Sequence, residues 1–426
     1  MKNKFFFVIL TVLALLHLAL LIPAFRNISH FKLQDSYQYL QLAQNILHQG
    51  KYTGQAASDL DLVRPPVYPV FLAAGLLLGQ DGQWIPLLQT LILFATAYIL
   101  YRIGNDLGNE TIGKIASILY LFNPNAAFWA TTILTETLAA FWLGMSFWML
   151  VRFGKTYKYS YLAASGMLLG LAALTRPIVY PLIFILAIIL FLFWWFQHKE
   201  KISRVLVIKR VVVFLSAGLI LVFPWQVRNL VVHNDFTLST VDNSTFQDWM
   251  VGKSIAEMKN ITREQAVAEI AASPDPLRYS LEFIAEHPIP FIKTQVRGLF
   301  RVLLGSEYGT WAQVLGNQTI ETTGMLANFN LAVIWRIVSS GSIWVWAGIY
   351  ALLYDAILYG LCVTALIVIT LRNKNALKNP LLMLLVIIIG YMIVIPGPAG
   401  ESRFRVPVDP LLALFAGFTF SSSNKR

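Results

Sequence analysis

Long apolar runs separated by short polar stretches dominate the pattern of this chain. The first run, from Phe5 to Phe25, would be about 31 Å long as an α-helix, which is enough to cross the hydrocarbon core of a bilayer. Later runs have the same character, and together they predict an α-helical, polytopic transmembrane bundle of about 10 spans, within a range of about 9 to 13. The expected spans are 5–25, 84–103, 114–130, 136–151, 161–174, 177–196, 210–224, 343–371, 380–395 and 407–421.

The first run could also be mistaken for a signal peptide, because Lys2 and Lys4 precede it. A signal peptide has a shorter apolar core, and a small-residue cleavage site follows that core. The sequence after Phe25 shows no such site. We therefore expect a retained first helix, and its removal as a signal is the alternative.

The composition supports a membrane protein. Apolar residues make up 57% of the 426 residues and charged residues only 13%, whereas soluble domains contain about 25% charged residues. A chain this poor in charge could not cover the surface of a soluble fold. The same composition excludes a disordered chain, a coiled coil and a nucleic-acid-binding domain. The single cysteine, Cys362, excludes an intrachain disulfide.

The net charge of +11 follows from membrane topology rather than from a polyanionic partner. With the N-terminus inside, the short internal stretches hold about half of the 33 basic residues and few acidic residues. This positive-inside bias places two longer pieces, 26–83 and 225–342, on the external side. Short loops and the lack of extra modules predict a bacterial inner membrane, with these pieces facing the periplasm or the exterior.

The first external loop, 26–83, holds the most informative polar residues. Asp35 opens a helical stretch that ends at Gly50. Asp35 is a favoured N-cap residue and Gly50 a favoured C′ residue, so a capping role explains Asp35 as well as a functional role does. The two roles are compatible, because a helix start can also fix a catalytic side chain. Further candidates in this loop are Tyr37, Tyr39, Arg64 and Tyr68.

Charged residues also lie at the external ends of other expected spans. Glu136 begins the fourth span, where the helix dipole stabilises an acid, so a structural role is a full alternative to a functional one. Charges at one face avoid the cost of a charge at the bilayer centre, about 2.5–3.5 kcal/mol each on insertion scales, and could build a site. Asp355 lies within the run 343–371 and needs a partner or a water-filled cavity. The remaining candidates are Arg176, Arg228, Glu401, Arg403 and Arg405.

The second external piece carries half of the 22 acidic residues and is expected to contain helices. Thr262-Arg263-Glu264-Gln265 predicts a helix start, and Pro274 its end. Residues 277–304 are amphipathic, which predicts a helix on the membrane surface or, equally, a helix packed in a small external domain. The chain therefore divides into an N-terminal transmembrane module (1–224), an external region (225–342) and C-terminal transmembrane helices (343–426).

The order of these elements resembles the GT-C superfamily of integral membrane glycosyltransferases. Within it, the chain is similar to the bacterial branch related to protein O-mannosyltransferases and lipid A aminoarabinose transferase. The resemblance covers nearly the whole chain, is least in 225–342, and rests on the ordered set rather than on any one motif. The set comprises Asp35-Ser36-Tyr37-Gln38-Tyr39, Arg64-Pro65-Pro66-Val67-Tyr68-Pro69, Thr135-Glu136-Thr137-Leu138, Leu174-Thr175-Arg176-Pro177, Pro224-Trp225-Gln226-Val227-Arg228-Asn229 and Glu401-Ser402-Arg403-Phe404-Arg405-Val406-Pro407.

The resemblance implies transfer of a sugar at the external membrane face, from a polyprenyl-phosphate-linked donor to an acceptor and with inversion. It implies that Asp35 is the general base and Glu136 the second acid. It also implies that Arg403 binds the donor phosphate, a task that the guanidinium fork suits, with Arg176 and Arg228 as further candidates. Region 225–342 would select the acceptor, whose hydroxyl or phosphate could belong to a glycan, a glycolipid or a protein.

Many relatives have Asp-Glu where this chain has Asp35-Ser36. We therefore predict no metal cofactor, and a divalent metal stays the alternative. The expected partners are the lipid-linked donor, the acceptor and membrane lipid, with no nucleic acid. The alternative function is a transporter or lipid-handling protein without transferase chemistry, which Asp355 favours because transporters place polar sites near the bilayer midplane. A non-catalytic scaffold would not need the acidic loop and the terminal arginines together.

Overall fold

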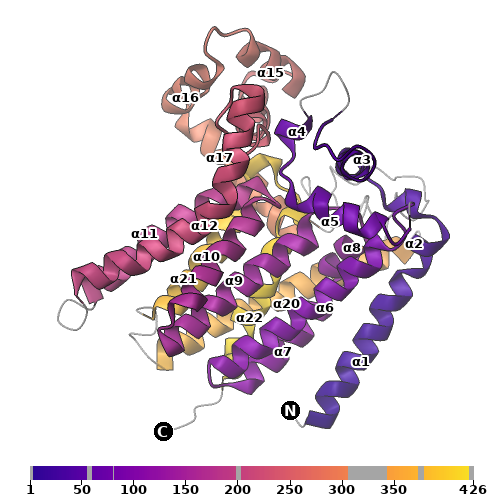
Figure 1. Cartoon of the computed structure of the whole chain (residues 1–426), viewed down its shortest axis with the longest axis vertical. Coiled ribbons are helices and arrows are strands. Elements are labelled where there is room, and N and C mark those ends of the chain that lie inside the picture. The colour runs from indigo at the N-terminus through magenta and orange to yellow at the C-terminus, as the bar shows by residue number, and fades with distance from the viewer. Residues whose placement is uncertain are drawn as a thin grey trace.

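The computed structural model describes residues 3–54, 60–79, 81–197, 203–305, 343–372 and 379–421. Every regular element in these ranges is a helix. Figure 1 shows the long helices side by side in one bundle, with a smaller group of helices, α15 to α17, at one end. The N-terminus lies at the opposite end of the bundle. The expectation of an all-helical, polytopic membrane fold is confirmed, and the external placement of the smaller group stays a prediction.

Six helices in the described part of the chain are long and apolar enough to cross a membrane. Each coincides with an expected span, although several extend beyond it. The N-terminal one is α1 (Asn3–Leu20), which α2 (Ile22–Arg26) continues. The others are α6 (Ile85–Asp106), α9 (Glu136–Thr156), α11 (Tyr180–Gln197), α12 (Arg204–His233) and α20 (Ile343–Arg372).

The other four expected spans are shorter helices. The run 114–130 forms two helices, α7 (Glu110–Leu121) and α8 (Pro124–Thr131), because Asn123 caps the second helix with its side chain and Pro124 cannot continue the first. The other three are α10 (Tyr159–Ala173), α21 (Pro380–Val394) and α22 (Asp409–Gly417). A buried helix need not reach across the bilayer by itself, and α22 is buried along its whole length.

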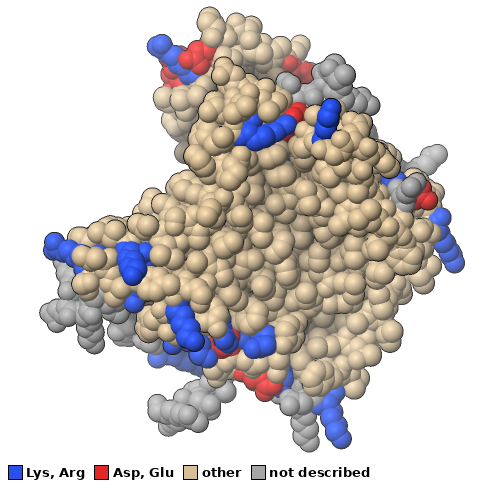
Figure 2. All heavy atoms as spheres, in the orientation of Figure 1, with Lys and Arg blue, Asp and Glu red and all other residues tan. Residues whose placement is uncertain are grey.

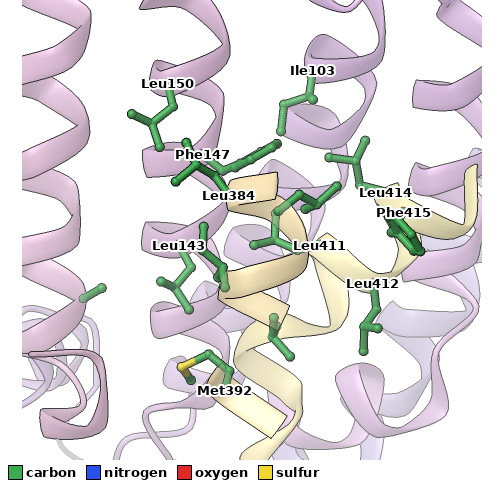
Figure 3. Packing of buried hydrophobic residues seen from close by; sticks show 14 of the residues in the cluster. Ile103, Leu143, Phe147, Leu150, Leu384, Met392, Leu411, Leu412, Leu414 and Phe415 are labelled. Carbon is green, nitrogen blue, oxygen red and sulfur yellow. The ribbon is translucent and has the colours of Figure 1, made fainter. Parts of the chain in front are cut away.

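The core of the bundle surrounds α22. Figure 3 shows apolar side chains of α6, α9, α21 and α22 meeting there, among them Phe147 and Leu411, which are 2% and 0% exposed. Elsewhere in the bundle, α10 and α12 approach closely at Gly166, where a Cβ atom would lie 2.2 Å from the carbonyl oxygen of Phe214. Dense apolar packing of this kind supports the polar groups at the helix ends.

The first external loop folds over one end of the bundle. It forms α3 (Gln34–Gln49), α4 (Leu60–Val63) and α5 (Val67–Leu76). Leu40 and Ala43 of α3 are buried in a cluster with Leu72 of α5, so these residues form the packed face of the helix. Gly50 ends α3 with φ +63°, the left-handed conformation expected of a C-terminal glycine.

The second external piece is a small helical unit with its own apolar cluster. Its helices are α13 (Val241–Ser244), the π-helix η3 (Thr245–Val251), α14 (Gly252–Lys259), α15 (Arg263–Ala271), α16 (Pro276–Glu286) and α17 (Pro288–Leu304). Thr262 and Gln265 form the expected capping box of α15. The division at 224/225 falls within α12, which continues to His233. The rest of region 225–342, beyond Gly305, lies outside the described residues.

Residues 277–304 form two helices rather than one, because the helix breaks at His287-Pro288. Four apolar residues of α17 are exposed on one side: Ile289 at 77%, Ile292 at 58%, Val296 at 45% and Phe300 at 56%. This exposed stripe suits contact with the membrane surface, which stays a prediction.

Those basic residues of the short loops that the structure describes, such as Arg152 and Lys155, lie at the end of the bundle away from α3 (Figure 1 and Figure 2). Figure 2 shows Lys and Arg side chains along that end, with few acidic ones. Asp106 at the end of α6 joins Arg152 and Lys155 of α9, with both nitrogens 3.4 Å from its carboxylate. The two polar ends of the bundle are therefore distinct, as the positive-inside count predicts.

Candidate active site

Asp35 lies in the first turn of α3 but does not cap it. The helix begins at Gln34, with Leu33 at the N-cap position. The hydroxyl of Ser36 accepts a hydrogen bond from the Leu33 amide at 2.9 Å and donates to the carbonyl oxygen of Ile133 at 2.8 Å. The N-cap interpretation of Asp35 is therefore wrong, because Ser36 takes that task and leaves the Asp35 carboxylate available to other side chains.

Two arginines hold the Asp35 carboxylate. Arg64 Nη2 donates to Oδ1 at 2.7 Å, and Arg403 Nη1 lies 3.4 Å from Oδ2. Burial by itself would raise the pKa of Asp35, but the charges of Arg64, Arg403 and Arg176 outweigh burial and lower it. The side chain stays 32% exposed. Asp35 is thus an ionised, partly accessible carboxylate at the end of the bundle.

Arg64 is fixed by three further contacts from α3. Its Nε and Nη2 donate to Gln38 Oε1 at 2.9 and 2.7 Å, and its Nη1 donates to the Tyr39 hydroxyl at 3.2 Å. The guanidinium carbon lies 4.8 Å from the centre of the Tyr39 ring. Arg64 therefore ties the proline-rich turn to the helix that carries Asp35, as well as pairing with the carboxylate.

The tyrosine candidates have different places. Tyr39 packs edge-on against Tyr68, with ring centres 5.0 Å apart. Tyr68 is fully buried, and its hydroxyl donates to Gln89 Oε1 at 2.8 Å. Its fixed ring therefore holds the Tyr39 ring in place. Tyr37 is 57% exposed and is not among the residues that contact Asp35 or Arg64.

Glu136 and Arg176 form a second buried ion pair. Arg176 Nη1 donates to Glu136 Oε1 at 2.5 Å and to the Thr135 hydroxyl at 3.1 Å. Glu136 is 2% exposed, and its other oxygen, Oε2, is buried without a hydrogen-bond partner among the described residues. A buried, unpaired carboxylate oxygen retains the capacity to accept a hydrogen bond.

Phe404 joins the two ion pairs. The guanidinium of Arg176 lies 5.1 Å from the centre of its ring, and that of Arg403 lies 5.3 Å from it. Contacts therefore run without a break from Asp35 to Glu136, through Arg403, Phe404 and Arg176. We call these five residues, with Arg64, the Asp35–Glu136 cluster.

The loop that carries Arg403 is packed tightly on α17. Gly298 of α17 meets Gly397, where a Cβ atom on Gly298 would lie 2.2 Å from the carbonyl oxygen of Gly397. Gly397 itself has φ +49°, which favours glycine. Glu401, which is exposed, lies 3.5 Å from Arg403 Nε. The external unit thus helps to position Arg403.

Asp355 and Arg405, two of the candidates from the sequence, do not join the Asp35–Glu136 cluster. Arg405 is completely buried and contacts Asp355 at 2.7 Å and Asp409 at 2.9 Å. It also donates to the carbonyl oxygen of Leu303 at 2.7 Å and to Tyr359. The arginine supplies the partner that Asp355 needs, and the group connects α17, α20 and α22.

Arg228 belongs to a third group, at the end of α12. Its Nη2 donates to Asp61, whose carboxylate also lies 3.0 Å from His233 Nε2. Arg228 Nη2 also donates to the Tyr52 carbonyl oxygen at 3.1 Å, and the Tyr52 hydroxyl donates to the Arg64 carbonyl oxygen at 2.6 Å. Arg228 therefore anchors the first external loop beside Asp35. Sequence reasoning missed Asp61, although it lies only three positions before Arg64.

Among the described residues, no group of three or more His, Cys, Asp or Glu side chains lies close enough to hold a metal ion. The hydroxyl of Ser36, at the position of the second carboxylate in many relatives, is buried and bonded to backbone groups. Both oxygens of Asp35 face guanidinium groups. These side chains do not fit a two-carboxylate metal site.

Residues 63–227 match the family model of dolichyl-phosphate-mannose-protein mannosyltransferases. This stretch includes Arg64, Glu136 and Arg176 of the Asp35–Glu136 cluster. The sequence matches no curated protein.

The fold is similar to that of the Archaeoglobus fulgidus oligosaccharyltransferase, a GT-C enzyme. The apo form of that enzyme aligns with a TM-score of 0.52 and 13% identity, over 98% of this chain and 50% of that chain. This chain has a GT-C fold. The oligosaccharyltransferase AglB from Archaeoglobus fulgidus, in complex with an inhibitory peptide and a dolichol-phosphate, aligns with a TM-score of 0.49 and 13% identity, over 90% of this chain and 45% of that chain. The chain thus spans about half the length of these structures.

The resemblance to the GT-C superfamily is therefore confirmed, and the protein is an integral membrane protein. The Asp35–Glu136 cluster lies at the starts of α3 and α9.

Proposed function

We propose that this protein is a membrane glycosyltransferase that transfers a sugar from a polyprenyl-phosphate-linked donor to an acceptor hydroxyl or phosphate. The observation that carries the proposal is the Asp35 carboxylate, held between Arg64 and Arg403 on the accessible end of the bundle. This transfer needs a carboxylate that takes up the acceptor proton and, beside it, cations that bind the donor phosphate. The match to a dolichyl-phosphate-mannose-dependent family over 63–227 supports a lipid-phosphate donor.

Asp35 acts as the general base. As the acceptor oxygen attacks the anomeric carbon, its proton passes to Asp35, and the bond from that carbon to the phosphate oxygen breaks on the opposite side. The electron pair of that bond stays with the lipid phosphate, so the configuration at the anomeric carbon inverts. Base catalysis of this kind contributes about 10²–10⁴-fold.

Arg403 binds the donor phosphate and stabilises the charge that develops on it. Its contact with Asp35, at 3.4 Å, is the longer of the two arginine contacts of that carboxylate. Asp35 therefore holds Arg403 less firmly than it holds Arg64. A donor phosphate can displace Asp35 from Arg403 more readily than from Arg64. That exchange would remove one cation from Asp35 and make the carboxylate a stronger base once the donor is bound.

Arg176 and Glu136 support this step from the buried side. Arg176 is 9% exposed and lies 5.1 Å from the centre of the Phe404 ring, so it helps to fix the ring beside Arg403. Its charge also reaches Asp35, where it helps to lower the pKa. The free oxygen of Glu136 offers an acceptor for a sugar hydroxyl. Arg228 holds the loop through Asp61 rather than the donor.

The reaction is proposed to need no metal, because charge on the leaving phosphate can be met by Arg403 and Arg176. Full activity after dialysis against EDTA is the expected result. Activity that is lost with EDTA and restored by Mg²⁺ or Mn²⁺ would contradict this part of the proposal.

The proposed location is a bacterial inner membrane, with α3 and the helical unit α13 to α17 facing the periplasm or the exterior. This unit packs on the loop that carries Arg403, so it is placed to present the acceptor. The positive-inside bias of the short loops supports this orientation.

The transporter alternative rested on Asp355. Because Arg405 and Asp409 enclose this residue in a buried group, it has a structural role and no longer favours a midplane transport site. The test is direct. Purified protein in nanodiscs is incubated with radiolabelled polyprenyl-phosphate sugars and with envelope extract as acceptor. Label that moves to a product in the wild type but not in Asp35→Asn supports transferase chemistry, and label that stays on the donor with every sugar tested opposes it.

A further inference from the structure

Arg210, near the start of α12, is a buried cation at the end of the bundle opposite the Asp35–Glu136 cluster. Its side chain is 7% exposed. It pairs with no carboxylate among the described residues, and its Nε and Nη1 atoms are buried without a hydrogen-bond partner there. A buried donor left unpaired costs about 1–3 kcal/mol, and more when it is charged. The proposed transferase chemistry gives this residue no role.

Three aromatic rings surround the Arg210 guanidinium. Its central carbon lies 5.6 Å from the ring centre of Phe153, 5.3 Å from that of Tyr157 and 5.3 Å from that of Trp194. Ring faces attract a cation but accept no strong hydrogen bond from the edge of the guanidinium. The cage therefore fixes Arg210 in place and leaves its N–H groups to another partner.

The surroundings are basic. Lys209 lies 5.3 Å from the ring centre of Tyr159, and Arg204 lies 5.0 Å from that of Trp195. Tyr159 also has a buried hydroxyl without a partner among the described residues. The exposed cations attract anions to this surface in general, whereas the unpaired donors of Arg210 and Tyr159 offer the specific contacts that an anion satisfies.

We infer that Arg210 and its aromatic cage form a binding site for a phosphate group, and that the ligand is the headgroup of an anionic phospholipid in the leaflet beside the short basic loops. A phosphate has several oxygens that can accept from guanidinium N–H groups at once. The site lies at the end of the long apolar helices α11 and α12, where a headgroup would meet it. Figure 1 shows α11 leaning away from the bundle.

The test uses the full-length protein in detergent with three probes: phosphatidylglycerol, phosphatidylcholine and inorganic phosphate. Bound lipid is counted by native mass spectrometry, and thermal unfolding is followed in the same samples. The wild type should bind phosphatidylglycerol at least about tenfold more tightly than Arg210→Met does, which corresponds to one charged hydrogen-bonded contact. Arg210→Met keeps the length of the side chain and fills the cage. Arg210→Lys keeps the charge but lacks the guanidinium fork, so it should recover lipid binding only partly. It also serves as the test variant if Arg210→Met does not fold.

Lys209→Met is the matched control, because it removes the same charge from the neighbouring position on the surface. A specific site predicts a small effect of Lys209→Met and a large effect of Arg210→Met. Equal losses in both variants would show general attraction of basic loops for anionic lipid and overturn the inference. Tighter binding of inorganic phosphate than of phosphatidylglycerol, lost with Arg210, would keep the phosphate site but overturn the lipid as its source.

An ion pair between Arg210 and an acidic residue of the same chain is a further outcome of the test. Glu200 lies outside the described residues and is the acidic residue nearest to Arg210 in the sequence. Glu200→Gln should leave phosphatidylglycerol binding unchanged. If Glu200→Gln lowers the melting temperature without lipid as much as Arg210→Met does, Arg210 pairs with Glu200 and the inference is overturned.

Discussion

Arg64 reaches Asp35 across 29 positions of the chain and donates to its carboxylate at 2.7 Å. The contact joins the proline-rich turn to the start of α3, and it sets the charge state of the carboxylate that we propose as the base. The same arginine also donates to Gln38 and Tyr39, so it is locked in place before any donor arrives. The base and its surroundings are therefore organised in the free protein.

The first prediction concerns Asp35→Asn. The amide keeps the size of the side chain but cannot take a proton from the acceptor, so transfer should fall by at least about 100-fold. Asp35 does not cap α3, so membrane insertion and the helix start should be retained. Transfer is measured with labelled donor, and folding by thermal unfolding of the same sample.

Asp106→Asn is the matched control for Asp35→Asn. Asp106 is also paired with basic side chains, Arg152 and Lys155, but at the other end of the bundle. The control should lose some stability and keep its turnover per folded molecule. Near-normal transfer by Asp35→Asn would remove Asp35 from the chemistry.

The second prediction concerns pH. Because burial is outweighed by Arg64, Arg403 and Arg176, the pKa of Asp35 lies below its unfolded value of about 3.9. The stability from this ionised carboxylate is therefore present above that value and is lost as the pH falls through the lowered folded pKa. Activity limited by Asp35 should accordingly be flat from about pH 5 to 7.

Arg64→Gln tests the cause of this shift. The variant removes the charge nearest to Asp35, so the pKa of Asp35 should rise and the acid limb of the kcat/KM profile should move to higher pH. Arg297→Gln, which breaks an exposed pair with Glu257, should leave the limb in place. An acid limb that does not respond to Arg64→Gln would belong to another group.

The fold was largely predictable because the apolar runs are strong local signals. Asn123-Pro124 even marks where the run 114–130 breaks, since this dipeptide is a helix cap followed by a residue that suits a first turn. The lengths of the buried helices were not predictable. A helix such as α22 is shielded by its neighbours, and a hydropathy pattern does not reveal that shielding.

The candidate site was predictable as a set of residues but not as a set of pairs. Asp35 was expected to cap α3, yet the Ser36 hydroxyl accepts from the Leu33 amide at the helix start and donates to the carbonyl oxygen of Ile133, 97 positions away. Arg405 was grouped with Arg403 because they are neighbours in the sequence. In the short 3-10 turns after Glu401 the two side chains leave in different directions, one to Asp35 and one to Asp355. Such choices depend on long-range packing.

The third prediction concerns the buried group at Arg405. Arg405→Met leaves two buried carboxylates, Asp355 and Asp409, without their cation, which should cost about 3–5 kcal/mol. The expected result is a large fall in melting temperature in detergent, with unchanged donor affinity in the protein that stays folded. Arg372→Gln removes an exposed arginine from the end of α20 and serves as the control. A stable Arg405→Met protein with weaker donor binding would place Arg405 in the site.

The fourth prediction concerns topology. Cys362→Ser gives a background without cysteine, into which Lys51→Cys or Thr156→Cys is introduced. Both positions are exposed, Lys51 after α3 and Thr156 at the end of α9. An impermeant maleimide should label position 51 in intact cells and position 156 only after lysis. Labelling of position 156 but not of position 51 in intact cells would show the opposite orientation in the membrane, with the Asp35–Glu136 cluster on the inner side.

The fifth prediction separates two roles of Arg403. If Arg403 grips the donor phosphate equally in the ground and transition states, Arg403→Ala should raise the KM for the donor; if it grips mainly the leaving charge, kcat should fall. Arg403→Lys should recover only part of the loss, because a point charge replaces a fork. Donor titration and turnover are measured on the same preparation.

The competing account is that Arg403 only holds its loop, through Asp35, Glu401 and the ring of Phe404. Under that account Arg403→Ala would lower the melting temperature while donor affinity and turnover of the folded protein stay unchanged. Arg297→Ala removes the same charge from α17, which packs on the loop of Arg403, and should leave donor affinity as it is, which excludes a general effect of positive charge. Loop stability and donor binding are measured on the same molecules. If donor binding is weaker in Arg403→Ala but not in Arg297→Ala, Arg403 contacts the donor phosphate.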